Sequence, residues 1–211
     1  LNFGYDDSGN SHLREVKEPR SFTVLADGSV LAGSVNGTLG YYDSKGNFKG
    51  YIYPASPGRM QLSSTPGMIA PRIYALYQNR DGNVWLGTKG SGIFIIRKDG
   101  TYTHYGPCEQ GSRYFRGANV YDFHADARGR LWIATYGQGL YLADKVSGEP
   151  VFRDISRTAP AYPKDSSSLY LRRITHSDDG TVVLSSNGGI IYFSDSFTRP
   201  SDIDFHVSRH V

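Results

Sequence analysis

The sequence has few of the residues that cross-link a chain, span a membrane or bind nucleic acid. Its 211 residues include one cysteine, Cys108, so no disulfide can form within the chain and no cysteine-based metal site is available. No apolar run approaches the length of a membrane span, and no window repeats apolar residues at the helical period. The net charge of +3 is small and the basic residues are scattered, which argues against nucleic acid as a partner.

Glycine and aromatic residues, in contrast, are abundant. The chain has 25 glycines, 16 tyrosines and 10 phenylalanines, a composition typical of strands joined by tight turns. It begins at Leu1 without a methionine or a targeting segment, so we expect it to be a piece of a longer protein.

One motif recurs four times along the chain. Each copy has a turn residue, a glycine and an apolar run that ends in a small or hydroxyl residue. The copies are Asp27–Ser34, Asp81–Thr88, Arg128–Thr135 and Asp179–Ser186. Their starts are 54, 47 and 51 residues apart (81 − 27, 128 − 81 and 179 − 128). Strand-length pieces that repeat every ~40–50 residues are the signature of a propeller blade.

The repeat predicts an all-β fold of the β-propeller class with four four-stranded blades and a half-blade. In each copy an Asp-Gly type turn joins the first two strands. We expect a single partial propeller domain over 1–211, a fragment of a larger propeller, with a half-blade at 1–19 and blades at 20–55, 72–106, 119–156 and 170–211. A closed four-bladed ring is the less favoured alternative, because one cysteine cannot tie its ends together.

Strand direction sorts the loops onto two faces. The loops between second and third strands, such as 89–91 and 136–138, are expected on the same face as the long linkers, roughly 54–72, 106–119 and 156–170. The short Asp-Gly hairpins lie on the other face. Because function usually resides in variable loops on a rigid scaffold, we expect it on the linker face.

Two copies also point to a family. Gly82-Asn83-Val84-Trp85-Leu86-Gly87-Thr88 followed by Gly90-Ser91-Gly92-Ile93, and Gly129–Thr135 followed by Gly137-Gln138-Gly139-Leu140, resemble the two-component regulator propeller repeat. The linker Tyr162–Leu169 is similar to a connector between its blades. The other two copies have Leu31 and Val183 where the family has tryptophan, so those blades are expected to pack differently.

The resemblance implies the periplasmic sensor region of a hybrid histidine kinase–response regulator, built from paired seven-bladed propellers. Oligosaccharide binding in that family shifts a homodimer and drives a cytoplasmic kinase, and the parent protein is membrane-anchored. The kinase, receiver and DNA-binding parts are not present in this sequence. The repeat motif is structural, so it transfers no ligand residues to this chain.

Candidate ligand-binding residues therefore come from the linker face itself. The linker 106–119 has the densest mixture of cationic and aromatic residues: Arg113, Tyr114 and Arg116 could hold a carboxylate or sulfate while the ring stacks. The alternative is a loop tucked against the next blade with solvated arginines. Lys89 and Tyr136 occupy matched positions on this face, and Tyr162, Lys164 and Tyr170 are weaker candidates.

For several other residues the sequence favours a structural role over a binding role. Trp85 and Trp132 repeat at one blade position, which indicates packing between blades more than a sugar platform. His124 and His176 end the equivalent first strands of two copies. We therefore expect them to occupy one repeated structural position rather than a metal site. Asp residues in the turns suit turn geometry better than calcium.

No metal site, cofactor or catalytic residue is predicted, and the leading hypothesis is a non-catalytic sensing module for an oligosaccharide. The alternatives are a propeller enzyme of the lactonase, lyase or glycosidase type and a protein-binding scaffold. An enzyme would need a metal or paired carboxylates, and Asp122 is the one acid on the predicted first strands.

Overall fold

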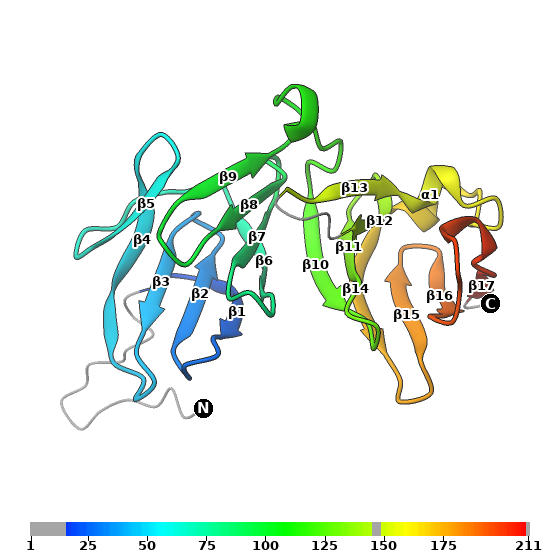
Figure 1. Ribbon diagram of the computed structural model, residues 1–211, viewed down its shortest axis with the longest axis horizontal. Helices are drawn as coiled ribbons and strands as arrows, with labels where there is room; N and C mark the ends of the chain where they lie inside the picture. The colour runs from blue at the N-terminus through cyan, green and yellow to red at the C-terminus, as the bar shows by residue number, and fades with distance from the viewer. Residues whose placement is uncertain (1–15, 145–148, 210–211) are drawn as a thin grey trace. The chain divides into compact units, whose positions relative to one another are not determined.

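The computed structural model describes residues 16–144 and 149–209 and divides into two compact units, Leu1–Tyr105 and Gly106–Val211 (Figure 1). Each unit contains two antiparallel sheets in which the strands follow one another in chain order. Each sheet corresponds to one predicted blade. The fold is therefore all-β with four blades, as the repeat predicted. The predicted half-blade at 1–19 falls mostly on residues outside the described ones.

The first unit holds a five-stranded sheet and a four-stranded sheet. The first sheet consists of β1 (Pro19–Val24), β2 (Val30–Ser34), β3 (Leu39–Tyr42), β4 (Phe48–Ser56) and β5 (Arg59–Ser63). The second consists of β6 (Ile73–Gln78), β7 (Val84–Thr88), β8 (Ile93–Ile96) and β9 (Tyr102–Tyr105).

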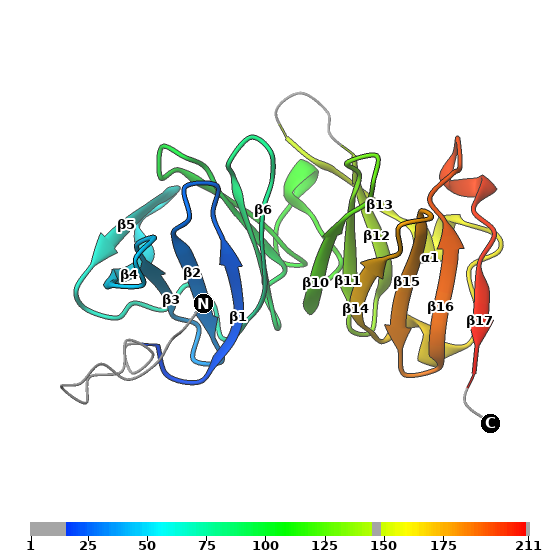
Figure 2. The same ribbon diagram turned by 90° about the horizontal axis from the view of Figure 1, so that it is seen from below.

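The second unit holds two four-stranded sheets and the short helices. Its first sheet consists of β10 (Val120–Ala125), β11 (Leu131–Thr135), β12 (Gly139–Asp144) and β13 (Val151–Asp154). Its second consists of β14 (Leu171–His176), β15 (Thr181–Ser186), β16 (Gly189–Ser194) and β17 (His206–Ser208), which Figure 2 shows side by side. The helices are η2 (Gly111–Arg113), α1 (Ile155–Thr158), η3 (Ser166–Leu169) and η4 (Pro200–Asp202). Among the described residues, no helix has the length and apolarity to cross a membrane.

The repeated glycine makes the first hairpin of every blade possible. Gly28, Gly82, Gly129 and Gly180 all have φ between 76° and 84°, a conformation that favours glycine. The turn carboxylates support the backbone there: the Asp27 carboxylate accepts from Ser29 N at 2.9 Å. Hydrogen bonds from the Ser29 hydroxyl and from Ser29 N lower the pKa of Asp27. Asp126 and Asp179 likewise accept from Arg128 N at 3.0 Å and from Thr181 N at 2.9 Å, so these two acids have the turn role predicted for them.

Every first strand carries an irregularity that the sequence did not predict. The pairing register with the second strand shifts at the same place in all four blades. The extra residue has no cross-strand partner in the ladder, and a bulge of this kind redirects its side chain. The extra residues are Arg20, Tyr74, Tyr121 and Arg172.

The two sheets of each unit pack through their first and second strands, and we call this packed surface the seam. In the first unit β1 and β2 contact β6; in the second, β10 and β11 contact β14. Gly33 on β2 allows close approach, since a Cβ at that position would overlap Ile73. Leu31 belongs to the first unit's core, and Trp132 holds the matched place in the second.

Strand prediction failed in one linker. The segment 54–72 was expected to be irregular, but β4 continues to Ser56 and a hairpin returns as β5. The hairpin also bonds to the neighbouring sheet: Met60 N donates to Gly100 O at 2.7 Å, and Tyr102 N donates to Gly58 O at 2.9 Å. Pro54 lies within β4, and Pro57 and Gly58 form the turn of a regular hairpin instead of marking an open linker.

Candidate functional site

Tyr136 is the centre of an aromatic and cationic cluster in the second unit. It is the first residue after β11. Its ring stacks on Tyr121 at a centroid distance of 5.1 Å and meets the Tyr170 ring edge-on at 4.9 Å. The Arg172 guanidinium carbon lies 4.9 Å from the centroid of the Tyr136 ring. A cation at this distance from an aromatic face is attracted by the ring quadrupole.

Hydrogen bonds fix the hydroxyl end of the Tyr136 ring. Arg172 Nη2 lies 3.4 Å and Asn187 Nδ2 lies 3.3 Å from the Tyr136 hydroxyl, and both donate to it. Arg172 Nε also donates to Asn187 Oδ1 at 3.3 Å. The three side chains therefore form a closed polar network. We call Tyr121, Tyr136, Tyr170, Arg172 and Asn187 the tyrosine cluster.

The backbone explains why these residues meet. Tyr121 and Arg172 are the extra residues of the bulges in β10 and β14, so their side chains lie outside the alternation of the ladder. Tyr136 N donates to Asn119 O at 2.8 Å, and Asn187 N donates to Tyr170 O at 3.2 Å. These bonds close each blade at the same point and bring the 2–3 loop beside the start of the first strand.

The cluster is accessible to a ligand. Arg172 and Asn187 are exposed, Tyr121 and Tyr136 are half-buried, and 38% of Tyr170 is exposed. Aromatic rings offer an apolar face for stacking, and guanidinium and amide groups offer directional donors and acceptors. This combination of groups can hold a sugar ring.

A basic pocket of about 220 Å³ lies on the same unit. The loop that begins with Tyr136 contributes to both the tyrosine cluster and the basic pocket, because Gln138, two residues after Tyr136, lines the pocket. Its charged residues are Arg116, Arg157, Lys164 and Asp165, and its lining is completed by Gln138, Ser156, Pro163 and Leu169. The three cations leave a positive excess even when the Asp154 carboxylate beside Arg116 is counted with Asp165, which favours an anionic group there.

Asp154 organises one side of the basic pocket. It caps α1, where its carboxylate accepts from Arg157 N at 3.2 Å, and its Oδ2 lies 3.6 Å from Arg116 Nη1. Burial raises the pKa of Asp154, although the nearby Tyr141 hydroxyl, the Arg157 N–H and the arginines oppose this. Burial also raises the pKa of Tyr141. Arg116 is thus held by an ion pair while about half of its side chain stays exposed.

The predicted linker site is divided by one buried residue. Phe115 is 1% exposed and packs against Tyr141 and Phe152 at centroid distances of 4.9 and 4.7 Å. Arg113 ends η2 and is exposed, and Tyr114 is 53% exposed. The loop is therefore anchored to its blade through Phe115, in line with the alternative of a loop packed against a blade. Arg113 and Tyr114 face solvent, and Arg116 lines the basic pocket.

Lys89 lies in the first unit at the position matched to Tyr136. Its backbone N donates to Arg72 O at 3.0 Å, the counterpart of the bond from Tyr136 to Asn119. Lys89 is half-buried, and the bulge residue of the same blade is Tyr74, over which the Arg20 guanidinium lies at 5.4 Å. The matched positions are thus confirmed, and the first unit fills them with more cations than the second.

Trp132 packs between two blades, the structural role predicted for both tryptophans. Trp132 is fully buried and its Nε1 donates to Asp126 Oδ2 at 2.9 Å. Its ring meets Phe193 at 5.0 Å across the seam. Trp85 is 7% exposed.

The histidine expectation was wrong in register. His124 pairs with Trp132 in the ladder and His176 with Val182, so the two positions are one residue out of step. Their side chains nevertheless meet across the seam, with His124 Nε2 2.6 Å from His176 Nδ1. Burial and the neighbouring His176 lower the pKa of His124. Within the described residues, no group of three or more His, Cys, Asp or Glu is placed to hold a metal.

Asp122 also has a seam role that the sequence did not reveal. Its carboxylate accepts from Ile174 N of β14 at 2.9 Å and from its neighbour Phe123 N at 3.0 Å. Burial raises the pKa of Asp122 against the opposing effects of these bonds and of Arg173. Asp122 thus joins two blades.

Known proteins match this chain in sequence motif and in fold. Residues 67–90 and 114–137 match the two component regulator propeller family. A comparison with curated protein sequences finds no match.

Solved structures with the same fold share little sequence. An extracellular domain from B. thetaiotaomicron assigned to a hybrid two component system has 14% identity and a TM-score of 0.59, and the match covers 92% of this chain and 24% of that one. A catalytically inactive virginiamycin B lyase from Staphylococcus aureus, solved with quinupristin, has 16% identity and a TM-score of 0.55 over 89% of this chain and 54% of that one.

PorZ, a surface component of the type-IX secretion system of Porphyromonas gingivalis, has 18% identity and a TM-score of 0.54, with coverages of 85% and 27%. The chain therefore spans about half of the lyase and about a quarter of the other two. These likenesses show the fold, while the motif identifies the repeat. The chain carries two-component regulator propeller repeats.

Proposed function

We propose that this chain is a non-catalytic, ligand-sensing propeller segment of a hybrid two-component sensor, and that it binds an oligosaccharide at the tyrosine cluster. The family match and the hybrid-system neighbour support the sensor role. By the same resemblance, the proposal places the segment in the periplasm, in a membrane-anchored homodimer whose kinase lies outside this sequence.

The tyrosine cluster is the observation that carries the ligand proposal. A stacked pair of tyrosines, a guanidinium against the ring of Tyr136 and an exposed amide lie within hydrogen-bonding or stacking distance of one another. Their mutual hydrogen bonds hold them in place before a ligand arrives, which reduces the entropic cost of binding.

The basic pocket extends this surface. Arg116, Arg157 and Lys164 would contact a carboxylate or sulfate on the ligand, as a charge-assisted hydrogen bond is about twice as strong as a neutral one. Arg113 and Tyr114 on the exposed part of the neighbouring loop would contribute from the rim, and Lys89 would act at the matched place of the first unit.

Calorimetric titration of the chain with neutral and acidic oligosaccharides tests the proposal. We expect one series to bind, and Tyr136→Ala or Arg172→Ala to weaken it about fivefold or more, because truncating a contact at the centre of an interface can cost above ~1 kcal/mol. Arg113→Ala and Tyr114→Ala are expected to give smaller losses.

Tyr170 and Tyr192 provide a matched control. Both are tyrosines of the second unit with 38% of their surface exposed, but Tyr192 stacks on His206 away from the cluster. Tyr170→Ala should weaken binding and Tyr192→Ala should not. Equal effects of the two variants, or no oligosaccharide binding at all, would refute the tyrosine cluster as the site.

A propeller enzyme is the second candidate, favoured by the fold likeness to virginiamycin B lyase. In this chain the acid to test is Asp122, whose raised pKa suits proton transfer. Lyase, lactonase or glycosidase turnover that is lost in Asp122→Asn would support the enzyme reading.

A further inference from the structure

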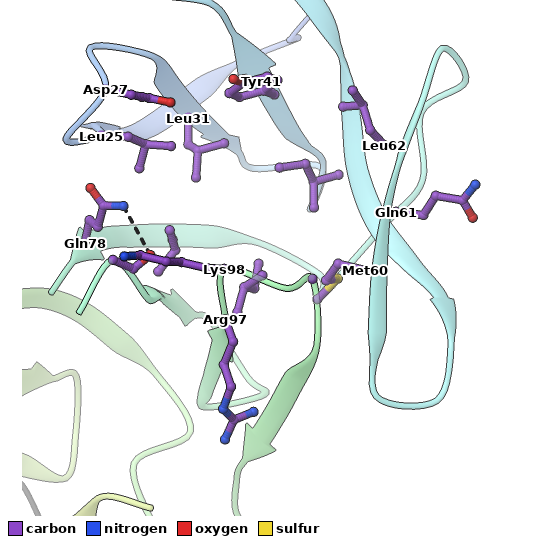
Figure 3. Close-up of a pocket in the computed structure, with 15 residues that line it drawn as sticks. Leu25, Asp27, Leu31, Tyr41, Met60, Gln61, Leu62, Gln78, Arg97 and Lys98 are labelled. Carbon is purple, nitrogen blue, oxygen red and sulfur yellow. Dashed lines mark hydrogen bonds between the residues drawn. The ribbon is translucent and has the colours of Figure 1, made fainter. Parts of the chain in front are cut away.

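The first unit contains an apolar cavity of about 400 Å³ at its seam, on the side of the Asp-Gly hairpins (Figure 3). Its apolar wall comes from both sheets and from the β5 hairpin. The principal contributors are Leu25, Leu31, Ile52, Met60, Val84 and Ile96. Small-molecule sites in proteins are typically apolar hollows of ~300–1,000 Å³ with a few polar groups, so the cavity has the size and lining of such a site.

The matched place in the second unit explains the cavity. There, the indole of Trp132 fills the seam and Asp126 accepts its N–H. The ladder registers align Trp132 with Leu31, and the matching hairpin bonds, Asp126 N to Arg130 O and Leu25 N to Ser29 O, align Asp126 with Leu25. The first unit therefore has leucines in place of both the indole and its acceptor, and both leucines line the cavity.

Polar groups gather at one end of the cavity. Figure 3 shows Leu25 and Leu31 directed toward the side where Gln78 and Lys98 lie, whereas the Arg97 guanidinium points away. Gln78 is committed to the protein, since its Oε1 accepts from Ala26 N at 2.7 Å and its Nε2 donates to Gly82 O at 3.2 Å. The aliphatic stem of Lys98 lies over Gly82, where any Cβ would overlap its Cε.

The geometry points to a binding site for a flat apolar ligand of about indole size that carries an anionic group. The ring occupies the space that Trp132 fills in the second unit, and the anion contacts the Lys98 ammonium at the polar end. Asp27 also lies at the rim, where its Oδ1 accepts hydrogen bonds from Ser29 N and Oγ. This site is separate from the tyrosine cluster and does not depend on the proposed oligosaccharide ligand.

Titration of the full chain with indole and with indole-3-propionate tests the inference. We expect saturable binding of both, with indole-3-propionate about threefold tighter, a ratio typical of one exposed ion pair. Leu31→Trp should abolish binding of both by filling the cavity, and Leu31→Met, which conserves volume, should retain it. Lys98→Gln should remove the difference between the two probes.

Methyl NMR tests the inference on the unsubstituted chain, so this measurement does not require the Leu31→Trp variant to fold. Either probe should shift the methyl resonances of Leu25 and Leu31 and leave those of Leu140 and Leu184, which are fully buried in the second unit, unchanged. The inference fails if neither probe saturates up to its solubility limit, or if a folded Leu31→Trp variant still binds them. Shifts confined to the second unit would overturn it as well.

Discussion

The two units have the same blade pairing but fill their seams differently. In the second unit Trp132, Asp126 and Arg130 form a buried polar and aromatic plug: Arg130 Nε donates to Asp126 Oδ2 at 2.7 Å, and its guanidinium lies 3.8 Å from the Phe197 ring centroid. In the first unit the matched residues are Leu31, Leu25 and Ser29, and a cavity remains. The same blade pairing thus supports either a closed seam or a pocket, depending on three side chains and on the β5 hairpin, which supplies part of the cavity wall in the first unit.

The difference teaches that packing and binding are alternatives at one position of this fold. A large side chain with its own hydrogen-bond acceptor uses the space for stability. A smaller apolar side chain leaves the space to solvent or to a ligand, at a cost in stability that grows with cavity volume.

Removing the acceptor of the plug should have the largest effect. Asp126→Leu copies the first unit's residue into the second, leaving the Trp132 N–H and the Arg130 guanidinium without their buried partner. We expect a loss of about 3–5 kcal/mol in the free energy of unfolding, measured by chemical denaturation.

Asp178 offers the control for that substitution, because it is an exposed residue in the corresponding turn of the next blade. Asp178→Leu should change stability by less than about 0.5 kcal/mol. A similarly small loss in Asp126→Leu would show that the plug does not stabilise the second seam.

Removing the hydrogen bond that crosses each seam should have the next largest effect on stability. Asp122 accepts from Ile174 N in the second unit, and at the matched position Ser21 Oγ donates to Ile73 O at 3.3 Å in the first. Asp122→Ala leaves a backbone N–H unsatisfied and should cost about 1–3 kcal/mol, whereas Ser21→Ala should cost about 0.5–1.5 kcal/mol. Equal losses in denaturation experiments would contradict this distinction.

Asp122→Asn separates the hydrogen bond from the charge, because the amide oxygen can still accept from Ile174 N. The pKa of Asp122 is raised in the folded chain, so the folded state binds its proton more tightly than the unfolded state. Unfolding free energy should therefore fall as pH rises from the ordinary aspartate pKa through the raised one. In Asp122→Asn this contribution to the pH dependence should disappear.

The cation–ring contacts should give the smallest effect. Arg172 lies over Tyr136 in the second unit and Arg20 over Tyr74 in the first, at 4.9 and 5.4 Å. Each arginine-to-alanine change should cost about 0.5–1 kcal/mol, as expected for exposed cation–π contacts. Arg172→Ala should be the more costly of the two, since it also loses hydrogen bonds to Tyr136 and Asn187.

Much of the fold could be predicted from the sequence because the motif is repeated. The glycine of each turn and the alternating apolar residues locate the first three strands of every blade within a few residues. The β5 hairpin was missed because Pro54, Pro57 and the serines after it are typical of a loop. What makes the hairpin regular is its pairing with Gly100 and Tyr102, a contact distant in sequence.

The candidate site could be predicted only in part. The repeat aligned Tyr136 with Lys89, and Leu31 differed visibly from the two tryptophans. The bulges, however, leave no mark in residue type, since the extra residue is arginine in two blades and tyrosine in two. Without them the sequence could not show that Arg172 and Tyr121 meet Tyr136.

The recurring bulge has a consequence for how such repeats diversify. Because Arg20, Tyr74, Tyr121 and Arg172 stand outside the pairing of their strands, exchanging one of them leaves the hydrogen-bonded ladder intact. Each blade therefore has one position at which the residue can change while the strand pairing stays the same. Substitutions at these positions can change the chemistry of the surface one blade at a time.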